Sequence, residues 1–327
     1  MTQSQLSVVE ICAGAGGQAI GLELAGFKHA DAIDIDEDAC KTLRLNRPDW
    51  DVTHADVSDV DGRAYSGIDL LAGGVPCPPF SIAGKQLGGD DERDLFPEAL
   101  RLTREIEPRA VMLENVRGFA APRFETYRRR LAAELGDMGY EVQWTVLNAV
   151  EYGVPQIRPR FILVALRHDD ARYFSWPATG LNGLSVGETI SDLMGELGWP
   201  GVEQWRGKAN RPAPTIVGGS KKHGGPDLGP SRARAEWRRL GVEGKSIADL
   251  APSPDFPEDG LPRLTVRMVA RLQGFPDTWN FVGTKTSSYK QVGNAFPPPV
   301  AMAVGLRIEA ALSQRDLTLP RQLSLAK

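Results

Sequence analysis

The sequence predicts an α/β fold in which helices cover both faces of a parallel sheet, followed by a smaller irregular module. Strand-like and helix-like segments alternate through the first half of the chain, and several of the strands are short, fully apolar runs. This alternation is typical of a sheet that is buried on both sides. After about Arg167 the chain becomes rich in Gly, Pro, Trp and basic residues as far as about Pro262. We therefore expect a separate module there rather than a continuation of the sheet.

The individual elements follow from apolar runs, amphipathic periodicity and turn residues. The expected strands are Ser7–Cys12, Lys28–Ile35, Asp69–Gly73, Ala110–Glu114, Val142–Val150 and Arg160–Leu166. The expected helices between them are Gln18–Ala25, Glu37–Leu45, Glu98–Ile106 and Arg123–Met138. Helical character returns after the irregular module, at Thr265–Leu272 and Pro298–Leu312.

Composition places this chain among ordinary globular proteins of the cytoplasm. It has 327 residues, and it begins without a basic region followed by an apolar run, so we expect no signal peptide. No stretch reaches the roughly 18 apolar residues of a membrane-spanning helix. The three cysteines, Cys12, Cys40 and Cys77, are widely spaced and do not cluster with histidine. This pattern predicts a reduced protein with neither a disulfide framework nor a metal site.

The charge distribution points to a polyanionic partner although the formal net charge is −4. Between Glu203 and Lys245, ten Lys and Arg residues stand against four Asp and Glu residues, a local excess of six positive charges. A basic face on an acidic protein is the electrostatic pattern of nucleic-acid binding. A solvated charged surface is the alternative.

A glycine-rich turn, Ala13–Gly17, follows the first strand and opens a helix. Glycines at this place let a ligand approach the backbone beside the helix N-terminus. Asp34, near the end of the second strand, is placed to accept from ribose hydroxyls, and Asp56 from an exocyclic amine. Together these residues describe an adenosyl pocket. A dinucleotide pocket is the competing interpretation.

Two chemically active groups end neighbouring strands of the expected sheet. Cys77 stands in a loop framed by Gly and Pro directly after a buried strand, and Glu114 ends the next strand. Open α/β folds place their ligands at this edge. Arg158 and Arg160 alternate on the run into a later strand, so that both side chains share one face. Two guanidinium groups on one face suit a phosphate or a carbonyl oxygen.

Six ordered strings make the chain resemble the bacterial DNA cytosine-5 methyltransferases. They are the AGAGG turn, the Pro76-Cys77 loop, Glu114-Asn115-Val116, Gln156-x-Arg158-x-Arg160, RLQGFP at 271–276 and GNA-x-PPP at 293–299. The resemblance spans Ile11 to Val300 and departs from the family at Cys12, where many members carry Phe, at Pro78, where Gln is common, and at Met268, where Glu is common.

The resemblance implies roles for individual residues. Cys77 would attack cytosine, Glu114 would hold and protonate its ring nitrogen N3, and Arg160, supported by Arg158, would contact the base carbonyl. The pocket for S-adenosylmethionine would be lined by Cys12, Gly14, Ala15, Gly17, Asp34, Ile35, Asp56, Val57, Pro76, Leu95, Asn294 and Phe296. Contacts to DNA would come from Ser81, Gln156, Lys221, Lys222, Arg232 and Arg234.

The resemblance also implies how the chain is organised and what it meets. Its fold would be the Rossmann-like methyltransferase fold with a mixed sheet. A catalytic unit would span residues 1–180, a target-recognition unit 181–284, and a C-terminal segment 285–327 would return to the first. The substrate would be duplex DNA, from which one cytosine is flipped out. The protein would act as a monomer, and a cognate restriction endonuclease is a candidate partner.

Three other interpretations remain open on sequence grounds. A tRNA cytosine methyltransferase would carry a similar set of motifs. A catalytically dead DNA-binding module would keep the basic segment, but intact Cys77 and Glu114 argue against it. A dehydrogenase would use the glycine turn for a nicotinamide cofactor.

Overall fold

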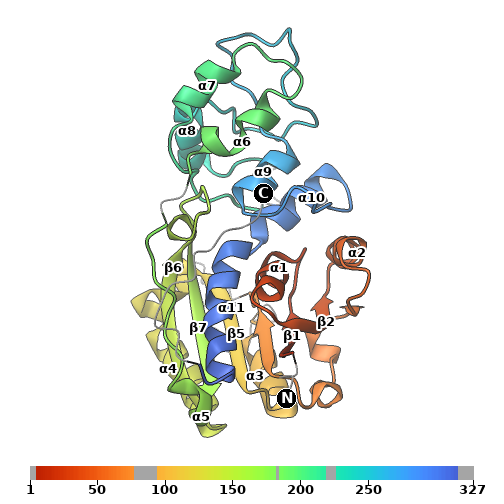
Figure 1. Ribbon diagram of the computed structural model, residues 1–327, viewed down its shortest axis with the longest axis vertical. Helices are drawn as coiled ribbons and strands as arrows, with labels where there is room; N and C mark the ends of the chain where they lie inside the picture. The colour runs from red at the N-terminus through yellow and green to blue at the C-terminus, as the bar shows by residue number, and fades with distance from the viewer. Residues whose placement is uncertain (1–4, 77–93, 182–183, 219–225, 316–327) are drawn as a thin grey trace.

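A seven-stranded sheet forms the centre of the computed structural model, which describes residues 5–76, 94–181, 184–218 and 226–315 (Figure 1). The strand order is β3-β2-β1-β4-β5-β7-β6. Strands β3 to β5 in this order run parallel, whereas β7 is antiparallel to β5 and β6. The predicted mixed sheet is therefore confirmed. The strands are β1 Ser7–Ile11, β2 Lys28–Asp34, β3 Val52–His54, β4 Leu70–Gly73, β5 Ala110–Val116, β6 Tyr140–Asn148 and β7 Pro159–Arg167.

Helices cover both faces of the sheet and continue beyond it. They are α1 Gly17–Leu24, α2 Glu37–Asn46, α3 Phe96–Ile106, α4 Glu125–Asp137, α5 His168–Ala171, α6 Val186–Met194, α7 Val202–Lys208, α8 Ser231–Arg239, α9 Val266–Leu272, α10 Lys285–Asn294 and α11 Pro298–Leu312. The expected strands and helices of the first half are present, with ends moved by a few residues. The sequence patterns do not indicate β3, α5, α10 or the helices α6 to α8 of the irregular module.

The two faces of the sheet carry different helices (Figure 1). Helices α1 and α11 bury one face, with Leu22 and Ala301 in the same apolar cluster. Gly21 makes this packing possible, because a Cβ atom there would lie 2.5 Å from the Cβ atom of Ala301. Helices α3 and α4 bury the other face, where Phe96 and Phe161 share a second cluster. Burial on both sides explains why β4 is fully apolar.

A third apolar cluster lies beyond the sheet and joins α6, α8, α9 and α10. Its largest members include Trp199 and Trp237, both almost fully buried. The cluster extends to Ile20 and Leu43, so this upper part of the molecule packs directly on α1 and α2. Among the described residues, no helix combines the length and the apolar character needed to cross a bilayer.

Candidate active site

The glycine turn between β1 and α1 is held by a single carboxylate. The backbone N–H of Gly14 donates to Oδ2 of Asp34 at 2.7 Å, and that of Asp36 donates to Oδ1 at 2.8 Å. Gly14 has a φ of 53° and Gly16 a φ of 91°, which favours glycine at both positions. Burial raises the pKa of Asp34, and the two backbone hydrogen bonds oppose this shift. The ends of β1 and β2 therefore form one rigid corner.

Open space and exposed apolar surface lie beside this corner. A Cβ atom at Gly14 would meet nothing within 4 Å, and Ile35 is 65% exposed at the end of β2. At the adjacent end of β3, Asp56 accepts from the N–H and the hydroxyl of Ser58, which lowers the pKa of Asp56. Val57 beside it is buried. Asp34, Ile35 and Asp56 thus lie at neighbouring strand ends.

Cys12, between β1 and the glycine turn, adopts the left-handed conformation with a φ of 51°. Its side chain is half-buried between the glycine turn and the layer under α3. Burial raises the pKa of the Cys12 thiol to about 12, and the charges of Asp34 and Asp56 add to the shift. Cys12 is therefore a neutral thiol, which suits a wall of a pocket and does not suit a nucleophile.

The segment that joins α10 to α11 packs against the glycine turn. A Cβ atom at Gly17 would lie 2.4 Å from the carbonyl oxygen of Phe296. The Phe296 side chain is buried under α11, so any contact between Phe296 and a ligand is left to its backbone. Ala15 is also buried, and its carbonyl accepts from the indole N–H of Trp279 at 3.0 Å. Asn294, at the end of α10, is exposed.

The strand β4 leads into the segment that carries the predicted nucleophile. The side-chain amide of Asn115 donates to the carbonyl of Val75 at 2.8 Å, and the N–H of Leu95 meets the carbonyl of Pro76 at 3.4 Å. Pro76 and Leu95 are therefore neighbours. The predicted site residues Cys77, Ser81, Lys221 and Lys222, together with Pro78, lie outside the described residues.

Glu114 and Arg160 form a buried ion pair at the end of β5. Their side chains are each 11% exposed, and Nε of Arg160 lies 2.8 Å from Oε1 of Glu114. The register explains the pair, because Arg160 stands opposite Val116, two residues beyond Glu114 on the same face. Burial raises the pKa of Glu114, and the positive charges of Arg160 and Arg158 oppose it. A Cβ atom at Gly74 would lie 3.4 Å from Glu114, so the carboxyl also borders the end of β4.

Comparisons with known proteins agree with this arrangement. A family model described as C-5 cytosine-specific DNA methylase matches residues 6–310. The chain belongs to this family. The methylase is 56% identical over 312 residues to the Type II methyltransferase M.NaeI of Lentzea aerocolonigenes, a match covering 94% of this chain and 76% of the relative. It is 51% identical over 313 residues to the Type II methyltransferase M.NgoMIV of Neisseria gonorrhoeae, a match covering 95% of this chain and 100% of the relative. We conclude that it is a DNA (cytosine-5-)-methyltransferase.

Solved structures show the same fold. The Entamoeba histolytica methyltransferase EhMeth aligns with a TM-score of 0.66 at 17% identity, covering 95% of the methylase and 99% of that chain. A mutant of the Spodoptera frugiperda protein DNMT2 aligns with a TM-score of 0.65 at 16% identity, covering 93% of the methylase and 99% of that chain. At these identities the likeness concerns the fold alone.

The structure corrects the predicted role of Gln156. It was expected to contact DNA, but its side chain is completely buried. Its amide nitrogen donates to the side chain of Gln273 at 2.5 Å, and its oxygen accepts from the N–H of Ile216 at 2.9 Å. A polar side chain without exposed surface cannot reach a nucleic acid. Gln156 instead ties β7 of the methylase to the upper part of the molecule.

Arg158 has the same structural character. It is 0% exposed, and its guanidinium donates to the carbonyls of Ile216, Gly293 and Ala295. Burial lowers its pKa. Contact with a phosphate is therefore excluded, and Arg158 acts near the site only through the backbone segments and the charges around it.

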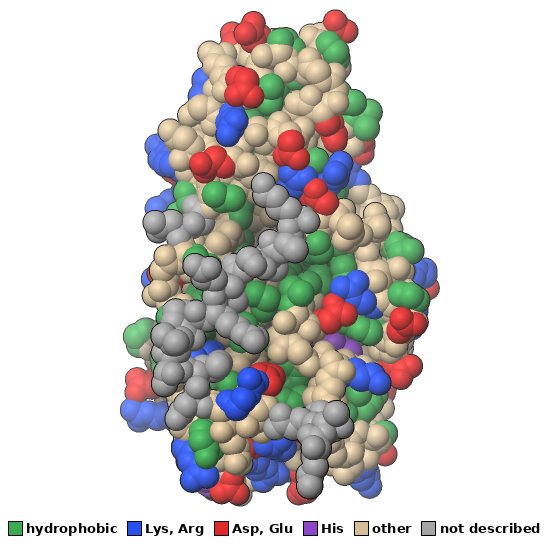
Figure 2. Space-filling view, in the orientation of Figure 1, with side chains coloured by type: hydrophobic (Ala, Val, Ile, Leu, Met, Phe, Trp, Pro, Cys, Tyr) green, Lys and Arg blue, Asp and Glu red, His purple; other side chains and the backbone are tan. Residues whose placement is uncertain are grey.

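The two predicted DNA contacts on α8 differ from each other. Arg232 is exposed, whereas Arg234 is partly buried and donates to the hydroxyl of Ser231 at 3.3 Å. Lys and Arg side chains of the described residues are interspersed with Asp and Glu on the face shown in Figure 2. The basic excess read from the sequence therefore does not form a uniform basic surface on this face.

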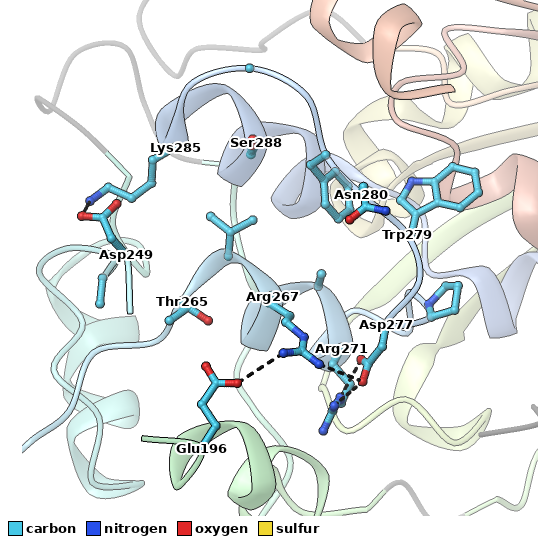
Figure 3. A pocket seen from close by; sticks show the side chains of 16 residues that line it. Glu196, Asp249, Thr265, Arg267, Arg271, Asp277, Trp279, Asn280, Lys285 and Ser288 are labelled. Atoms are coloured by element: carbon cyan, nitrogen blue, oxygen red, sulfur yellow. Dashed lines mark hydrogen bonds and ion pairs between the residues drawn. The ribbon is translucent and has the colours of Figure 1, made fainter. Parts of the chain in front are cut away.

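A hollow of about 610 Å³ beside α9 and α10 lies apart from Glu114 and Asp34 (Figure 3). Its charged lining is largely neutralised by ion pairs. Arg267 lies 3.2 Å from Glu196 and 3.7 Å from Asp277, while Lys285 lies 3.0 Å from Asp249. These pairs make the hollow a junction between elements rather than the place of the reaction.

Two contributors to the site were missed by the sequence analysis. Trp279 lines the hollow and supports the glycine turn through Ala15, and Asn115 holds the end of β4. Trp279 follows the RLQGFP string by three residues, so the motif itself was the signal for its neighbourhood. Asn115 lies inside the quoted string Glu114-Asn115-Val116, but no local pattern reveals that its side chain reaches another strand.

Proposed function

We propose that the methylase transfers a methyl group from S-adenosylmethionine to C5 of a cytosine flipped out of a specific duplex DNA site, with Cys77 forming a transient bond to C6. The observation that carries the proposal is the buried Glu114–Arg160 pair next to Gly74. It lies at the same edge of the sheet as the Asp34 corner and close to the strand end that leads to Cys77. An acid, a cation and a cofactor corner thus lie along one edge of the sheet, where open α/β folds bind their ligands.

The residues of the corner fit an adenosyl group. The space beside Gly14 admits a ligand against the backbone, and Ile35 offers exposed apolar surface for a flat ring. Asp34 and Asp56 place carboxylates at adjacent strand ends, where they can accept from hydroxyl and amine groups. Once bound there, S-adenosylmethionine supplies an electrophilic methyl group on its sulfonium. We assign Cys12, Val57, Pro76, Leu95 and Asn294 to the surrounding wall.

The chain's own groups make cytosine reactive. Addition of the Cys77 thiolate forms an S–C6 bond and breaks the C5–C6 double bond. Glu114 gives a proton to N3, which balances the negative charge that develops on the ring. Arg160 donates to the base carbonyl, and the Glu114 ion pair orients it. C5 then takes the methyl group, loses its proton to a base, and the S–C6 bond breaks as N3 returns its proton to Glu114.

This chemistry requires a base outside the helical stack, at a cost of a few kcal/mol. We propose that residues 181–284 grip duplex DNA and offset this cost. In that unit, contacts to DNA come from Lys221, Lys222, Arg232 and Arg234. From the catalytic unit, Ser81 approaches the DNA backbone. The relatives M.NaeI and M.NgoMIV carry the name Type II methyltransferase. We therefore propose that this protein belongs to a restriction-modification system with a cognate endonuclease.

Transfer of tritiated methyl groups from S-adenosylmethionine tests the proposal directly. We expect label in duplex DNA and none in tRNA; label in tRNA alone would replace DNA with the rival substrate.

Cys77→Ser should abolish transfer but bind the cofactor within about twofold of wild type, because Cys77 touches the base. A duplex containing 5-fluorocytosine should trap the wild-type protein covalently, because fluorine cannot leave as a proton does. Turnover by Cys77→Ser, or no trapped adduct, would remove the covalent step.

A further inference from the structure

Two glycines from distant parts of the chain face each other between the upper part of the molecule and α10. A Cβ atom at Gly293 would lie 2.6 Å from Cα of Gly218 and 2.7 Å from its nitrogen. A Cβ atom at Gly218 would lie 2.1 Å from Oδ1 of Asn294 and 2.6 Å from its Cγ. The Asn294 amide therefore rests directly on Gly218, and neither glycine has room for a side chain.

The backbones on both sides of this contact are fixed independently of it. Arg158 donates to the carbonyl of Ile216 on one side, and to those of Gly293 and Ala295, at 2.8 and 2.9 Å, on the other. Gln273 adds hydrogen bonds to the carbonyls of Val292 and Ala295, at 3.1 and 3.0 Å. These buried donors hold the two segments in register. The Asn294 side chain is the part of the contact that is free to move.

Asn294 has few other restraints. It is exposed, and within the described part of the chain no hydrogen bond holds its amide. A side chain of this kind samples several rotamers unless a neighbour restricts it. Gly218 supplies that restriction by filling the space on one side of the amide. It also stands immediately before residue 219, where the segment with the predicted DNA-contacting lysines begins.

The geometry points to Gly218 as a positioning residue for the methyl-transfer reaction, which sets the Asn294 amide for the cofactor from within the recognition unit. This inference rests on the proposed function, in which Asn294 belongs to the cofactor pocket. In this role Gly218 acts through the Asn294 side chain rather than by contacting the cofactor or the base itself. The contact joins Gly218, in the unit expected to recognise DNA, to Asn294, which we assign to the wall of the cofactor pocket.

Gly218→Ala tests this role, because the added methyl group would strike Asn294 at the end of a flexible side chain, which can rotate away without unfolding the protein. We expect the Kd for S-adenosylhomocysteine, measured by calorimetry, to rise about five- to tenfold, as for one lost hydrogen bond. The kcat at saturating cofactor should stay within about twofold, because the reacting groups are untouched. Gly207→Ala is the matched control: Gly207 lies in α7 and its Cβ would meet nothing within 4 Å.

A double-mutant cycle separates positioning from general damage. If Gly218 acts through Asn294, then Gly218→Ala combined with Asn294→Ala should bind S-adenosylhomocysteine no more weakly than Asn294→Ala alone. Additive losses, or a Kd for Gly218→Ala equal to that of wild type, would overturn the inference. An unchanged Kd for Asn294→Ala would overturn it as well. That result would leave the proposed function standing, provided wild-type protein still labels duplex DNA.

Discussion

At the scale of single residues, Glu114 shows how burial prepares a carboxyl group for acid chemistry. Its neighbour Arg160 favours the ionised form, whereas the apolar surroundings at the end of β5 favour the neutral one. Burial outweighs the two arginines and raises the pKa of Glu114. A raised pKa keeps the carboxyl protonated to a higher pH than an ordinary glutamic acid, which is the form that can donate to N3.

Glu114→Gln is expected to lower kcat/KM for duplex DNA by about 10²- to 10⁴-fold, the usual contribution of a general acid. In the wild-type enzyme the contribution of Glu114 should fall as pH rises through its raised pKa, because the donating proton is then lost. The amide variant should lack this limb of the pH profile. The exposed Glu125→Gln is the control, since Glu125 forms its ion pair with Arg129 on the surface of α4, away from Glu114. A Glu114→Gln profile that keeps the same limb would assign it to another group.

Residue roles were predictable where a motif fixes a position along a strand, and less so where partners come from far along the chain. The end of β5 places Glu114 by local sequence alone. The prediction for Gln156 is wrong because its partner Gln273 lies 117 residues away. A polar side chain in a loop gives no local sign that its hydrogen-bond partner is buried. Local patterns carry no information about such pairs.

At the scale of elements, α9 begins with an unusual cap. The hydroxyl of Thr265 accepts a hydrogen bond from the N–H of Met268 at 3.3 Å, and the Met268 sulfur accepts one from the N–H of Thr265 at 3.4 Å. Met268 therefore takes the position that Glu or Gln has in an ordinary capping box. Because Met268 is fully buried, an apolar side chain fits there and completes the cap as well.

Thr265→Ala should lower the free energy of unfolding by about 1 kcal/mol, because the N-terminal N–H groups of α9 lose their side-chain acceptor. Urea denaturation monitored by tryptophan fluorescence would measure the change. Thr265→Ser keeps the hydroxyl and should recover most of the stability. Equal losses in both variants would mean that the methyl group of Thr265, and not the cap, is responsible.

Local apolar patterns indicated most elements of the sheet unit but not α6, although its buried residues Val186, Ile190 and Leu193 follow helical spacing. Helix α10 buries Tyr289 and Val292 in the third apolar cluster, and side-chain hydrogen bonds also hold it to α2. Thr42 donates to Gln291 at 2.7 Å, and Ser287 donates to Asp38 at 2.6 Å. Strand β3 has three residues and exists because β2 offers an edge to pair with. Neither α10 nor β3 has a local sequence pattern strong enough to indicate it.

At the scale of the whole molecule, buried polar side chains join the sheet to the upper part. Arg158 and Gln156 reach from the beginning of β7 to Ile216, while Gln273 reaches from the end of α9 to the end of α10. The segments that carry Ile216 and Val292 are therefore tied to one buried polar cluster. In this arrangement the upper part keeps a defined position relative to Glu114, which the proposed binding of DNA around a flipped base would need.

The exposed Arg232 provides a test of that grip. If it contacts a phosphate, Arg232→Ala should weaken binding to all duplexes by a similar factor, because phosphates carry no sequence information. The slope of log Kd against log salt concentration should also become shallower by about one unit, since one fewer counterion is released. Fluorescence anisotropy with a labelled duplex at several salt concentrations measures both. Arg129→Ala, on α4 at the other end of the molecule, should keep the wild-type slope. If both variants keep it, Arg232 faces solvent in the complex and the recognition surface lies elsewhere on residues 181–284.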